Sequence, residues 1–119
     1  MKPTLVIGAS NRPEKYAYKA VKSLLNHGHS VCAFGRMKSQ IDGIEIETEW
    51  NPNWKVDTVT LYLNPQNQVE YYQKIIDLKP KRVIFNPGTE NETFQDLLES
   101  NGISTEIACT LVLLSINEY

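Results

Sequence analysis

Short apolar runs alternate along the chain with segments in which apolar residues recur at helical spacing. The runs with strand character cover residues 4–7, 30–34, 58–63, 82–85 and 104–107. Strands that alternate with helical segments are typical of βαβ units around a parallel sheet. We therefore expect an α/β fold with a Rossmann-like, doubly wound parallel sheet of five strands in the order 3-2-1-4-5, and helices on both faces.

The predicted helices lie between these runs and after the last of them. They cover about 14–26, the segment between Asn64-Pro65 and Lys79-Pro80, about 92–100 and about 110–116. Asn64 followed by Pro65 is a start signal, because asparagine caps a helix and proline fits its first position. The segment between the second and third strands predicts a loop with a short extended piece at 44–46. We expect its Trp50 and Trp54 to cover the edge of the sheet.

Composition narrows the functional classes. The chain has 119 residues, 41% of them hydrophobic and 22% charged, with a net charge of −2. This size predicts one domain over residues 1–119, and the chain lacks the basic excess typical of nucleic-acid binding. No apolar run approaches the roughly 20 residues that span a bilayer, so we expect no membrane partner. Cys32 and Cys109 show no metal-ligand spacing, and we expect a reduced, cytoplasmic protein without a metal site.

The loop after the first strand is the best candidate for a binding site. Open parallel sheets bind ligands beyond the carboxyl ends of their strands, at the point where the strand order reverses. The loop reads Gly8-Ala9-Ser10-Asn11-Arg12-Pro13-Glu14-Lys15. Gly8 permits a sharp turn, while backbone amides, the Ser10 hydroxyl and the helix N-terminus favour an anion. Arg12 and Lys15 add two cations, so we predict phosphate binding, the alternative being a plain turn with solvated charges.

The pattern departs from the dinucleotide fingerprint. Ser10 and Pro13 stand where G-x-G-x-x-G requires glycine. The second strand ends in Gly35-Arg36, where an NAD site needs an acid for the ribose hydroxyls. A cation at Arg36 favours a phosphorylated ribose, as in the 3′-phosphate of coenzyme A or the 2′-phosphate of NADP. The alternative for Arg36 is an ordinary exposed arginine.

The ends of the third and fourth strands complete the predicted rim. The segment Leu61-Tyr62-Leu63-Asn64-Pro65 offers an apolar wall and an amide for an adenine. The turn of Asn86, Pro87 and Gly88 offers polar groups that border a pantetheine arm. Tyr16, on the first turn of the first helix, either bonds a phosphate or packs against its neighbours.

Four motifs together resemble the small, stand-alone CoA-binding family of Rossmann domains. This family is related to the CoA-binding domain of the succinyl-CoA synthetase α subunit. The motifs are the loop at 8–15 with Tyr16 and Tyr18, His27-Gly28-His29-Ser30-Val31, Leu61-Tyr62-Leu63-Asn64-Pro65 and Asn86-Pro87-Gly88-Thr89-Glu90-Asn91. They follow one another in order over nearly the whole chain.

The resemblance implies a Rossmann fold that binds coenzyme A at the first loop and at the ends of strands two to four. It places Gly8, Ala9, Ser10, Arg12 and Lys15 at the phosphates, Gly35 and Arg36 near the ribose, and 63–65 near the adenine. Relatives often carry a Val-Asn-Pro-like run after the second strand, where this chain has Phe34-Gly35-Arg36. The ligase activity of the synthetases is not carried over, because their phosphohistidine domain has no counterpart in this sequence.

Two functional hypotheses remain open at this point. The first is a CoA-binding module without catalysis of its own, with a regulatory role among its options. The second is a small NADP-dependent reductase or an acyl- or thiol-transfer enzyme that uses Cys109, which follows the fifth strand at a predicted helix start. The size of the chain favours the module, since nicotinamide enzymes usually need a further domain to hold substrate. The apolar last helix, 110–116, predicts a surface for a homodimer.

Overall fold

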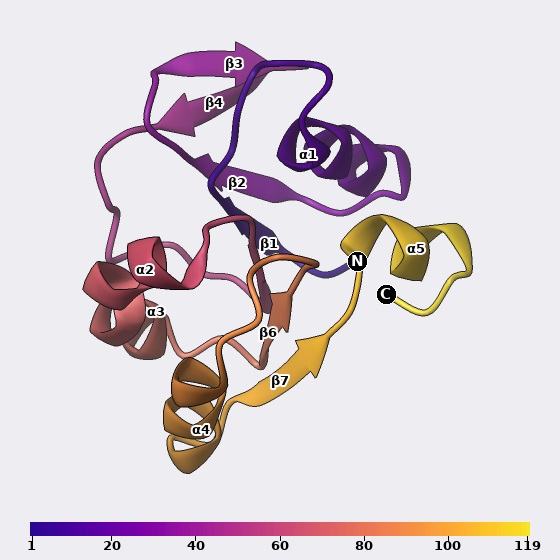
Figure 1. Ribbon diagram of the computed structural model, residues 1–119. Coiled ribbons are helices and arrows are strands. Elements are labelled where there is room, and N and C mark those ends of the chain that lie inside the picture. The colour runs from indigo at the N-terminus through magenta and orange to yellow at the C-terminus, as the bar shows by residue number, and fades with distance from the viewer.

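Seven short strands form one mixed sheet at the centre of the protein, in a computed structural model that describes residues 1–119 (Figure 1). The strands are β1 (Thr4–Ile7), β2 (Val31–Phe34), β3 (Ser39–Ile41), β4 (Ile44–Glu47), β5 (Thr58–Leu61), β6 (Arg82–Phe85) and β7 (Ser104–Ile107). The helices are α1 (Tyr16–Asn26), α2 (Pro65–Gln68), the 3-10 turn η1 (Val69–Tyr71), α3 (Tyr72–Leu78), α4 (Glu92–Ser100) and α5 (Thr110–Ser115).

The order of the strands is β3-β4-β2-β1-β5-β6-β7, and every pair is parallel except β3 with β4. The α/β, Rossmann-like class with a largely parallel sheet is therefore confirmed. The predictions of five strands and of the order 3-2-1-4-5 are wrong. The strand at 58–61 pairs directly with β1, with Thr58 opposite Thr4, and not with the far side of β2.

The segment predicted as a loop with a short extended piece holds the two additional strands. Asp42 and Gly43 both have positive φ, 47° and 84°, and join β3 to β4 as a two-residue hairpin. Asp-Gly is a strong signal for such a turn, because both central residues must adopt left-handed conformations. The hairpin delivers β4 to the position beside β2, where Ile46 lies opposite Ala33.

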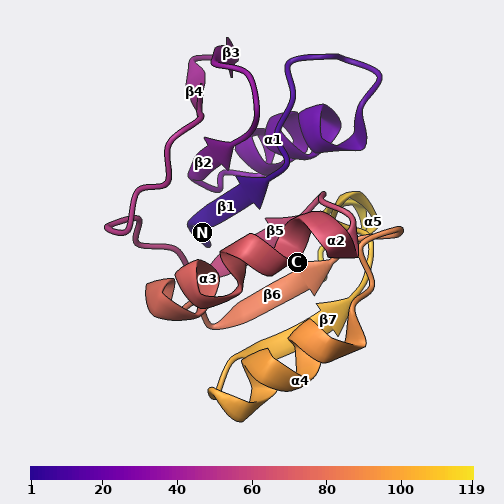
Figure 2. The same cartoon turned by 60° about the vertical axis from the view of Figure 1, so that its left-hand side comes forward.

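Helices cover both faces of the sheet (Figure 2). Side chains alternate between faces along each strand, so Leu5 and Ile7 join one buried cluster and Val6 joins the other. The first cluster packs under α3 and α4, and the second packs under α1 and α5. Trp50 and Trp54 belong with the first cluster, where their rings meet Phe34 edge-on at centroid distances of 5.3 and 6.0 Å.

Several predicted boundaries shift. Helix α1 begins at Tyr16 and not at 14, because residues 12–15 form a turn in which the Lys15 amide bonds the Arg12 carbonyl at 3.0 Å. The predicted strand at 58–63 ends at Leu61. The single helix predicted after Asn64-Pro65 is divided into α2, η1 and α3, and Val69, at the start of η1, is 58% exposed.

The predicted start of that helix is confirmed. The Asn64 side chain accepts a hydrogen bond from the Asn67 amide at 3.0 Å, and Pro65 occupies the first position. No helix of this protein combines the length and the apolar character needed to cross a bilayer.

Candidate functional site

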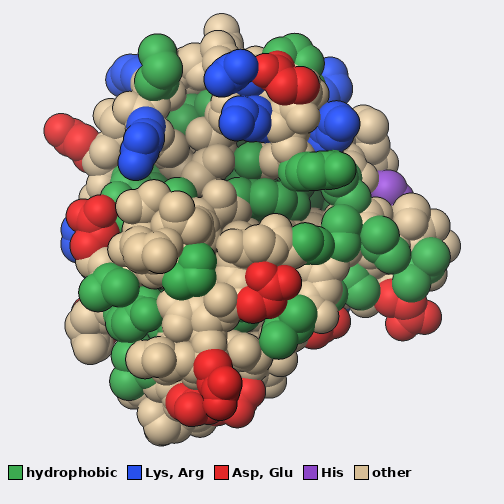
Figure 3. Space-filling model, in the orientation of Figure 1, with side chains coloured by type: hydrophobic (Ala, Val, Ile, Leu, Met, Phe, Trp, Pro, Cys, Tyr) green, Lys and Arg blue, Asp and Glu red, His purple; other side chains and the backbone are tan.

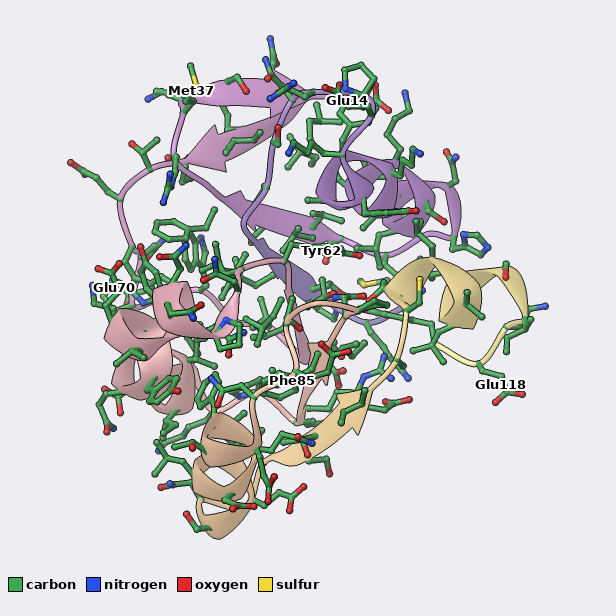
Figure 4. The ribbon with its side chains drawn as sticks, in the orientation of Figure 1. Glu14, Met37, Tyr62, Glu70, Phe85 and Glu118 are labelled. Carbon is green, nitrogen blue, oxygen red and sulfur yellow. The ribbon has the colours of Figure 1, made fainter.

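A cleft of about 500 Å³ opens at the carboxyl ends of β2, β1 and β5. Its lining combines small residues, cations and aromatic rings from the β1–α1 loop, the segments after β2 and β4, and the α2–η1 segment. The lining residues are Gly8, Ala9, Ser10, Asn11, Arg12, Lys15, Phe34, Gly35, Arg36, Met37, Thr48, Tyr62, Leu63, Asn67, Glu70 and Tyr71. Figure 4 shows Met37 on the hairpin side of this region, Glu70 on the helical side, and Tyr62 nearer the centre of the molecule.

Two glycines let three strand ends approach one another at the floor of the cleft. A Cβ on Gly35 would lie 2.3 Å from the Ala9 carbonyl oxygen, and a Cβ on Gly8 would lie 2.9 Å from the Tyr62 carbonyl oxygen. Gly8 also has a φ of +91°, so the predicted sharp turn is present. The amides of Gly8 and Ala9 both donate to the Phe34 carbonyl at 2.9 Å. The loops after β1 and β2 are therefore locked together, and one determines the position of the other.

The β1–α1 loop presents donors to the cleft. The Ser10 hydroxyl accepts a hydrogen bond from the Arg12 amide at 3.2 Å, which leaves its own proton free to donate. Lys15 caps α1 without a side-chain hydrogen bond to the first-turn amides. The first amides of a helix have no intrahelical partner and carry partial positive charge. The loop and the helix start therefore form an electropositive, donor-rich wall.

Positive charge gathers around the cleft in a protein with a net charge of −2. Arg12, Lys15 and Arg36 line it, against the single carboxylate of Glu70. Figure 3 shows Lys and Arg side chains around the hollow near β3 and the first loop, whereas acidic side chains gather over α4. Arg12 also pairs with Glu14 at 2.8 Å, and both side chains are exposed. A hydrogen bond from its own backbone, together with Arg12 and Lys15, lowers the pKa of Glu14.

An aromatic wall faces these cations. The ring of Phe34 meets that of Tyr71 edge-on at 5.4 Å, and Trp50 stacks on Tyr71 at 5.7 Å with 25° between the rings. Burial, and then the charge of Glu70, raise the pKa of Tyr71, while Arg36 acts in the opposite direction. Tyr71, Glu70 and Arg36 line the same cleft, and the rings of Phe34 and Tyr71 offer an apolar surface to a flat ligand ring.

The hydroxyl of Tyr62 is buried near the hydroxyls of Thr110 and Thr60 but makes no hydrogen bond of normal geometry with either. The hydroxyls of Thr60 and Thr110 bond each other at 2.8 Å. Burial raises the pKa of Tyr62 to about 12. This hydroxyl is therefore a neutral group at physiological pH.

The structure brings most of the predicted site residues together. Gly8, Ala9, Ser10, Asn11, Arg12, Lys15, Gly35, Arg36 and Leu63 all line the cleft. The predicted residues that do not line it are Tyr16, Asn64, Pro65, Asn86, Pro87 and Gly88. Tyr16 is 67% exposed and lies under the Lys19 ammonium group at 5.2 Å from the ring centre.

Asn86 has a clear structural role. It is 1% exposed, and its amide nitrogen donates to the Thr60 hydroxyl at 2.6 Å and to the Leu61 carbonyl at 2.9 Å. Its side-chain oxygen accepts from the Thr110 amide at 2.9 Å. Asn86 therefore ties the ends of β5 and β6 to the start of α5.

Several lining residues are absent from the sequence-based prediction. They are Phe34, Met37, Thr48, Asn67, Glu70 and Tyr71, whereas Tyr62 belongs to the predicted adenine wall and does line the cleft. Thr48 directly follows β4, so recognition of the Asp-Gly hairpin would have placed it at the same edge of the sheet. The helix start at Asn64 is a second signal in the sequence. Asn67, Glu70 and Tyr71 follow Asn64 by three, six and seven residues, a spacing that places them on one face of a helix.

The remaining reactive side chains lie outside the cleft. Cys109 is half-buried at the start of α5, and Cys32 is half-buried within β2, where burial raises its pKa. His29 accepts from the Lys2 amide at 2.9 Å, and a nitrogen of His27 lies 2.8 Å from the Ser23 carbonyl. No three or more His, Cys, Asp or Glu side chains converge on a point that could hold a metal ion.

This geometry coincides with a match to a known family. The family model of the CoA binding domain matches residues 2–115. The chain belongs to this family. Among curated proteins no sequence matches.

Several solved structures share the fold of this chain. A crystal structure of a protein described only as uncharacterized is 50% identical, with a TM-score of 0.97 over 100% of this chain and 98% of that one. A Thermus thermophilus protein is 19% identical, with a TM-score of 0.85 over 99% and 90% of the two chains. A conserved hypothetical protein of Pyrococcus furiosus is 23% identical, with a TM-score of 0.80 over 94% and 98%.

Proposed function

We propose that this CoA binding domain binds coenzyme A with the nucleotide half of the coenzyme in the cleft. One observation carries the proposal: three cations and a donor-rich loop face an aromatic wall across a cleft of about 500 Å³. A phosphorylated adenine nucleotide combines the matching chemistry, namely several negative charges and one flat, apolar ring. Membership of the family supports coenzyme A over other nucleotides.

The proposal assigns a role to each side of the cleft. Arg12, Lys15, the Ser10 hydroxyl and the amides near Gly8 hold the diphosphate, since an arginine fork and helix-start amides both suit phosphate oxygens. Arg36 holds the 3′-phosphate of the ribose. Asn11 lies on the same loop and adds an amide to the phosphate side.

The base lies on the other side of the cleft. Phe34, Tyr71 and Leu63 form its surface, while Asn64 and Pro65 fix the start of α2 behind Leu63. Tyr16 is assigned to the outer end of the phosphate loop.

Affinity for coenzyme A and for dephospho-CoA, measured by calorimetry, tests the role of Arg36. A charge-assisted contact is worth about 1.5–3 kcal/mol, so coenzyme A should bind about tenfold more tightly or better. Arg36→Ala should remove this difference. Lys38→Ala is the matched control, because Lys38 lies on the same connection, is exposed and does not line the cleft. Equal affinities for the two compounds in the unmodified protein would disprove the assignment.

NADP is the second candidate ligand, because Arg36 would also suit a 2′-phosphate. A ligand present at 100 times its Kd stabilises the folded protein by about 2.7 kcal/mol, which a thermal-shift experiment detects readily. Larger stabilisation by NADP than by coenzyme A would favour a reductase. We propose that the domain acts as a binding module, without catalysis by Cys109, which does not line the cleft.

We also propose a homodimer through the C-terminal helix and a reducing compartment such as the cytoplasm. Val112 and Ile116 are 52% and 56% exposed at α5, and Ile107 is 58% exposed on the neighbouring strand β7. Both cysteines are free, which suits a reducing compartment. Sedimentation should show a dimer that Val112→Lys converts to a monomer. Val69→Lys, an equally exposed valine on η1, should leave it intact; a monomer in the unmodified protein would disprove the proposal.

A further inference from the structure

All of the lining of the cleft comes from the first 71 residues of the chain. It uses the ends of β1, β2 and β5 with the segments that follow them and β4, but no residue of β6, α4, β7 or α5. In Figure 2 the elements β6, α4 and β7 lie on the far side of β5 from the hairpin of β3 and β4. Coenzyme A joins a phosphorylated adenosine to a long, uncharged pantetheine arm that ends in a thiol. The charged cleft matches the first part of that molecule only.

The adjoining part of the carboxyl edge, over which the arm would continue, has its polar groups engaged within the protein. Both donors and the acceptor of the Asn86 amide are used, as described above. The Thr89 hydroxyl donates to the Asn86 carbonyl at 2.7 Å. The Gly88 amide donates to the Glu90 carboxylate at 2.8 Å. The Asn86 side chain, the Thr89 hydroxyl and the Gly88 amide are therefore already bonded within the protein and are not available to the amides of a pantetheine arm.

The side chains of the following segment are engaged in the same way. Gln68 donates to the carbonyls of Leu63 and Thr89 at 2.9 and 2.8 Å. Asn91 donates to the Gln68 side-chain oxygen at 2.9 Å and to the Tyr72 hydroxyl at 2.8 Å. These bonds join α2 to the turn after β6 and close the gap between them.

An acyl chain would also need an apolar channel beneath this edge. The interior there is filled by Phe85 and Phe94, both fully buried and in edge-on contact at 5.8 Å, and by Leu114, which is 1% exposed. Two further hollows lie at the opposite edge of the sheet. One is lined by 102–105 with Glu99, and the other is bordered by Lys55, Lys79 and Lys81.

We infer that this protein recognises only the nucleotide end of coenzyme A and leaves the thiol end in solvent, so its ligand class is coenzyme A together with its acyl thioesters, without selection for the acyl group. The inference rests on the proposed function. The inference is carried by two neighbouring features: an open cleft that suits the nucleotide, and beyond it a surface whose polar side chains are bonded within the protein. Such a protein responds to the total pool of the coenzyme and its thioesters.

Calorimetry with a ligand series tests the inference. Coenzyme A, acetyl-CoA and octanoyl-CoA should bind with Kd values within about threefold of one another. Adenosine 3′-phosphate 5′-diphosphate, which lacks the arm, should retain affinity within about tenfold of coenzyme A, and pantetheine should not compete. Arg36→Ala should weaken coenzyme A and octanoyl-CoA by the same factor, because both bind through the same end.

The reactivity of the bound thiol gives a second readout. With protein in excess over coenzyme A, Ellman's reagent should react with the coenzyme thiol about as fast as in free solution, after subtraction of the reaction of Cys32 and Cys109. Strong protection of the thiol, or a mixed disulfide with the coenzyme that Cys109→Ser abolishes, would overturn the inference. A tenfold preference among acyl groups would also overturn it while leaving the proposed function intact. If no member of the series binds, the proposed function itself fails.

Discussion

The carboxyl edge of the sheet has two halves that use similar residues in opposite ways: an open half at the ends of β1 and β2, and a closed half at the end of β6. At the ends of β1 and β2, Lys15 and Arg36 line the cleft without an ion pair, and the Ser10 hydroxyl keeps its proton free. At the end of β6, Asn86 and Thr89 are buried and bonded within the protein. A polar residue after a strand therefore indicates a binding site only when the protein itself leaves that residue without partners.

The strongest test of this contrast is Asn86→Ala. The substitution strips partners from the Thr110 amide and the Leu61 carbonyl, and each buried polar group left without a partner costs about 1–3 kcal/mol. We expect the free energy of unfolding, measured with urea, to fall by about 3 kcal/mol. The affinity of the remaining folded protein for coenzyme A should be unchanged. Asn53→Ala, at an exposed loop position, should change stability by less than about 0.5 kcal/mol.

An Asn86→Ala variant that kept its stability but lost affinity for coenzyme A would contradict the structural role given to Asn86. The turn after β6 would then belong to the binding site, as the sequence alone predicts.

The second test concerns Gly35, on the open side of the edge. Gly35→Ala places a Cβ 2.3 Å from the Ala9 carbonyl oxygen, so the β1–α1 loop must move. Overpacking of this kind typically costs about 2 kcal/mol. The displaced loop should also weaken coenzyme A binding about tenfold or more, because loop position determines the phosphate contacts.

Gly43→Ala separates crowding from backbone strain. Gly43 has a φ of +84°, and no neighbouring atom lies within 4 Å of the place that a Cβ would take, so only the left-handed backbone is penalised. We expect a loss of about 1 kcal/mol and unchanged affinity. Equal effects of the two alanines on binding would show that the contact between Gly35 and Ala9 does not position the site.

The position of the β1–α1 loop at a cleft could be predicted from the sequence because its signals are local. A glycine after a strand, small residues and nearby cations stand together at 8–15, and the structure places them at one cleft. The same local reasoning identifies Asn64 as a cap, since capping depends on the next three residues only. Helices and strands with a strong local period are predictable for the same reason.

The rest could not be predicted because it depends on contacts between distant segments. The engagement of Asn86 depends on Thr110 and Thr60, which are 24 and 26 residues away. The strand order depends on which strand pairs with β1, a choice that no single segment encodes. The Asp42-Gly43 hairpin is the exception, since its turn signal is local and the sequence-based prediction misses it.

Tyr62→Phe is a smaller test, at the boundary between the two halves. Its buried hydroxyl lies near Thr110 and Thr60 without a hydrogen bond of normal geometry, so removal should raise the free energy of unfolding by about 1 kcal/mol at pH 7. The pKa of Tyr62 is raised to about 12 in the folded protein, from 10.0. The unfolded tyrosine therefore ionises first, and the unmodified protein loses stability as the pH rises from about 10 toward 12.

Denaturation at pH 7 and pH 11 measures both effects. The advantage of Tyr62→Phe over the unmodified protein should grow at pH 11, whereas Tyr16→Phe, at an exposed ring, should show no such growth. Loss of stability in Tyr62→Phe at pH 7 would mean that the hydroxyl makes a stabilising hydrogen bond, with Thr60 or Thr110 as the nearby groups.

The smallest expected effect is at Glu14, on the open side. Its carboxylate holds the Arg12 guanidinium at 2.8 Å, and a bound phosphate must compete with it. The pKa of Glu14 is lowered, chiefly by a hydrogen bond from its own backbone and also by Arg12, so the competitor is ionised at neutral pH. Ion pairs between exposed side chains are weak, because water and salt screen them. Glu14→Gln should therefore tighten coenzyme A binding only about two- to threefold.

Calorimetry at low and high salt checks this expectation. The gain should shrink as salt screens the charges, and Glu118→Gln, at the far side of the molecule from the cleft (Figure 4), should give no gain at either salt concentration. Weaker binding in Glu14→Gln would show instead that the carboxylate orients Arg12 toward the ligand. The ion pair of Arg12 and Glu14 would then be a fixed part of the binding site. The open half of the edge would differ from the closed half only in how many of its polar groups are bonded within the protein.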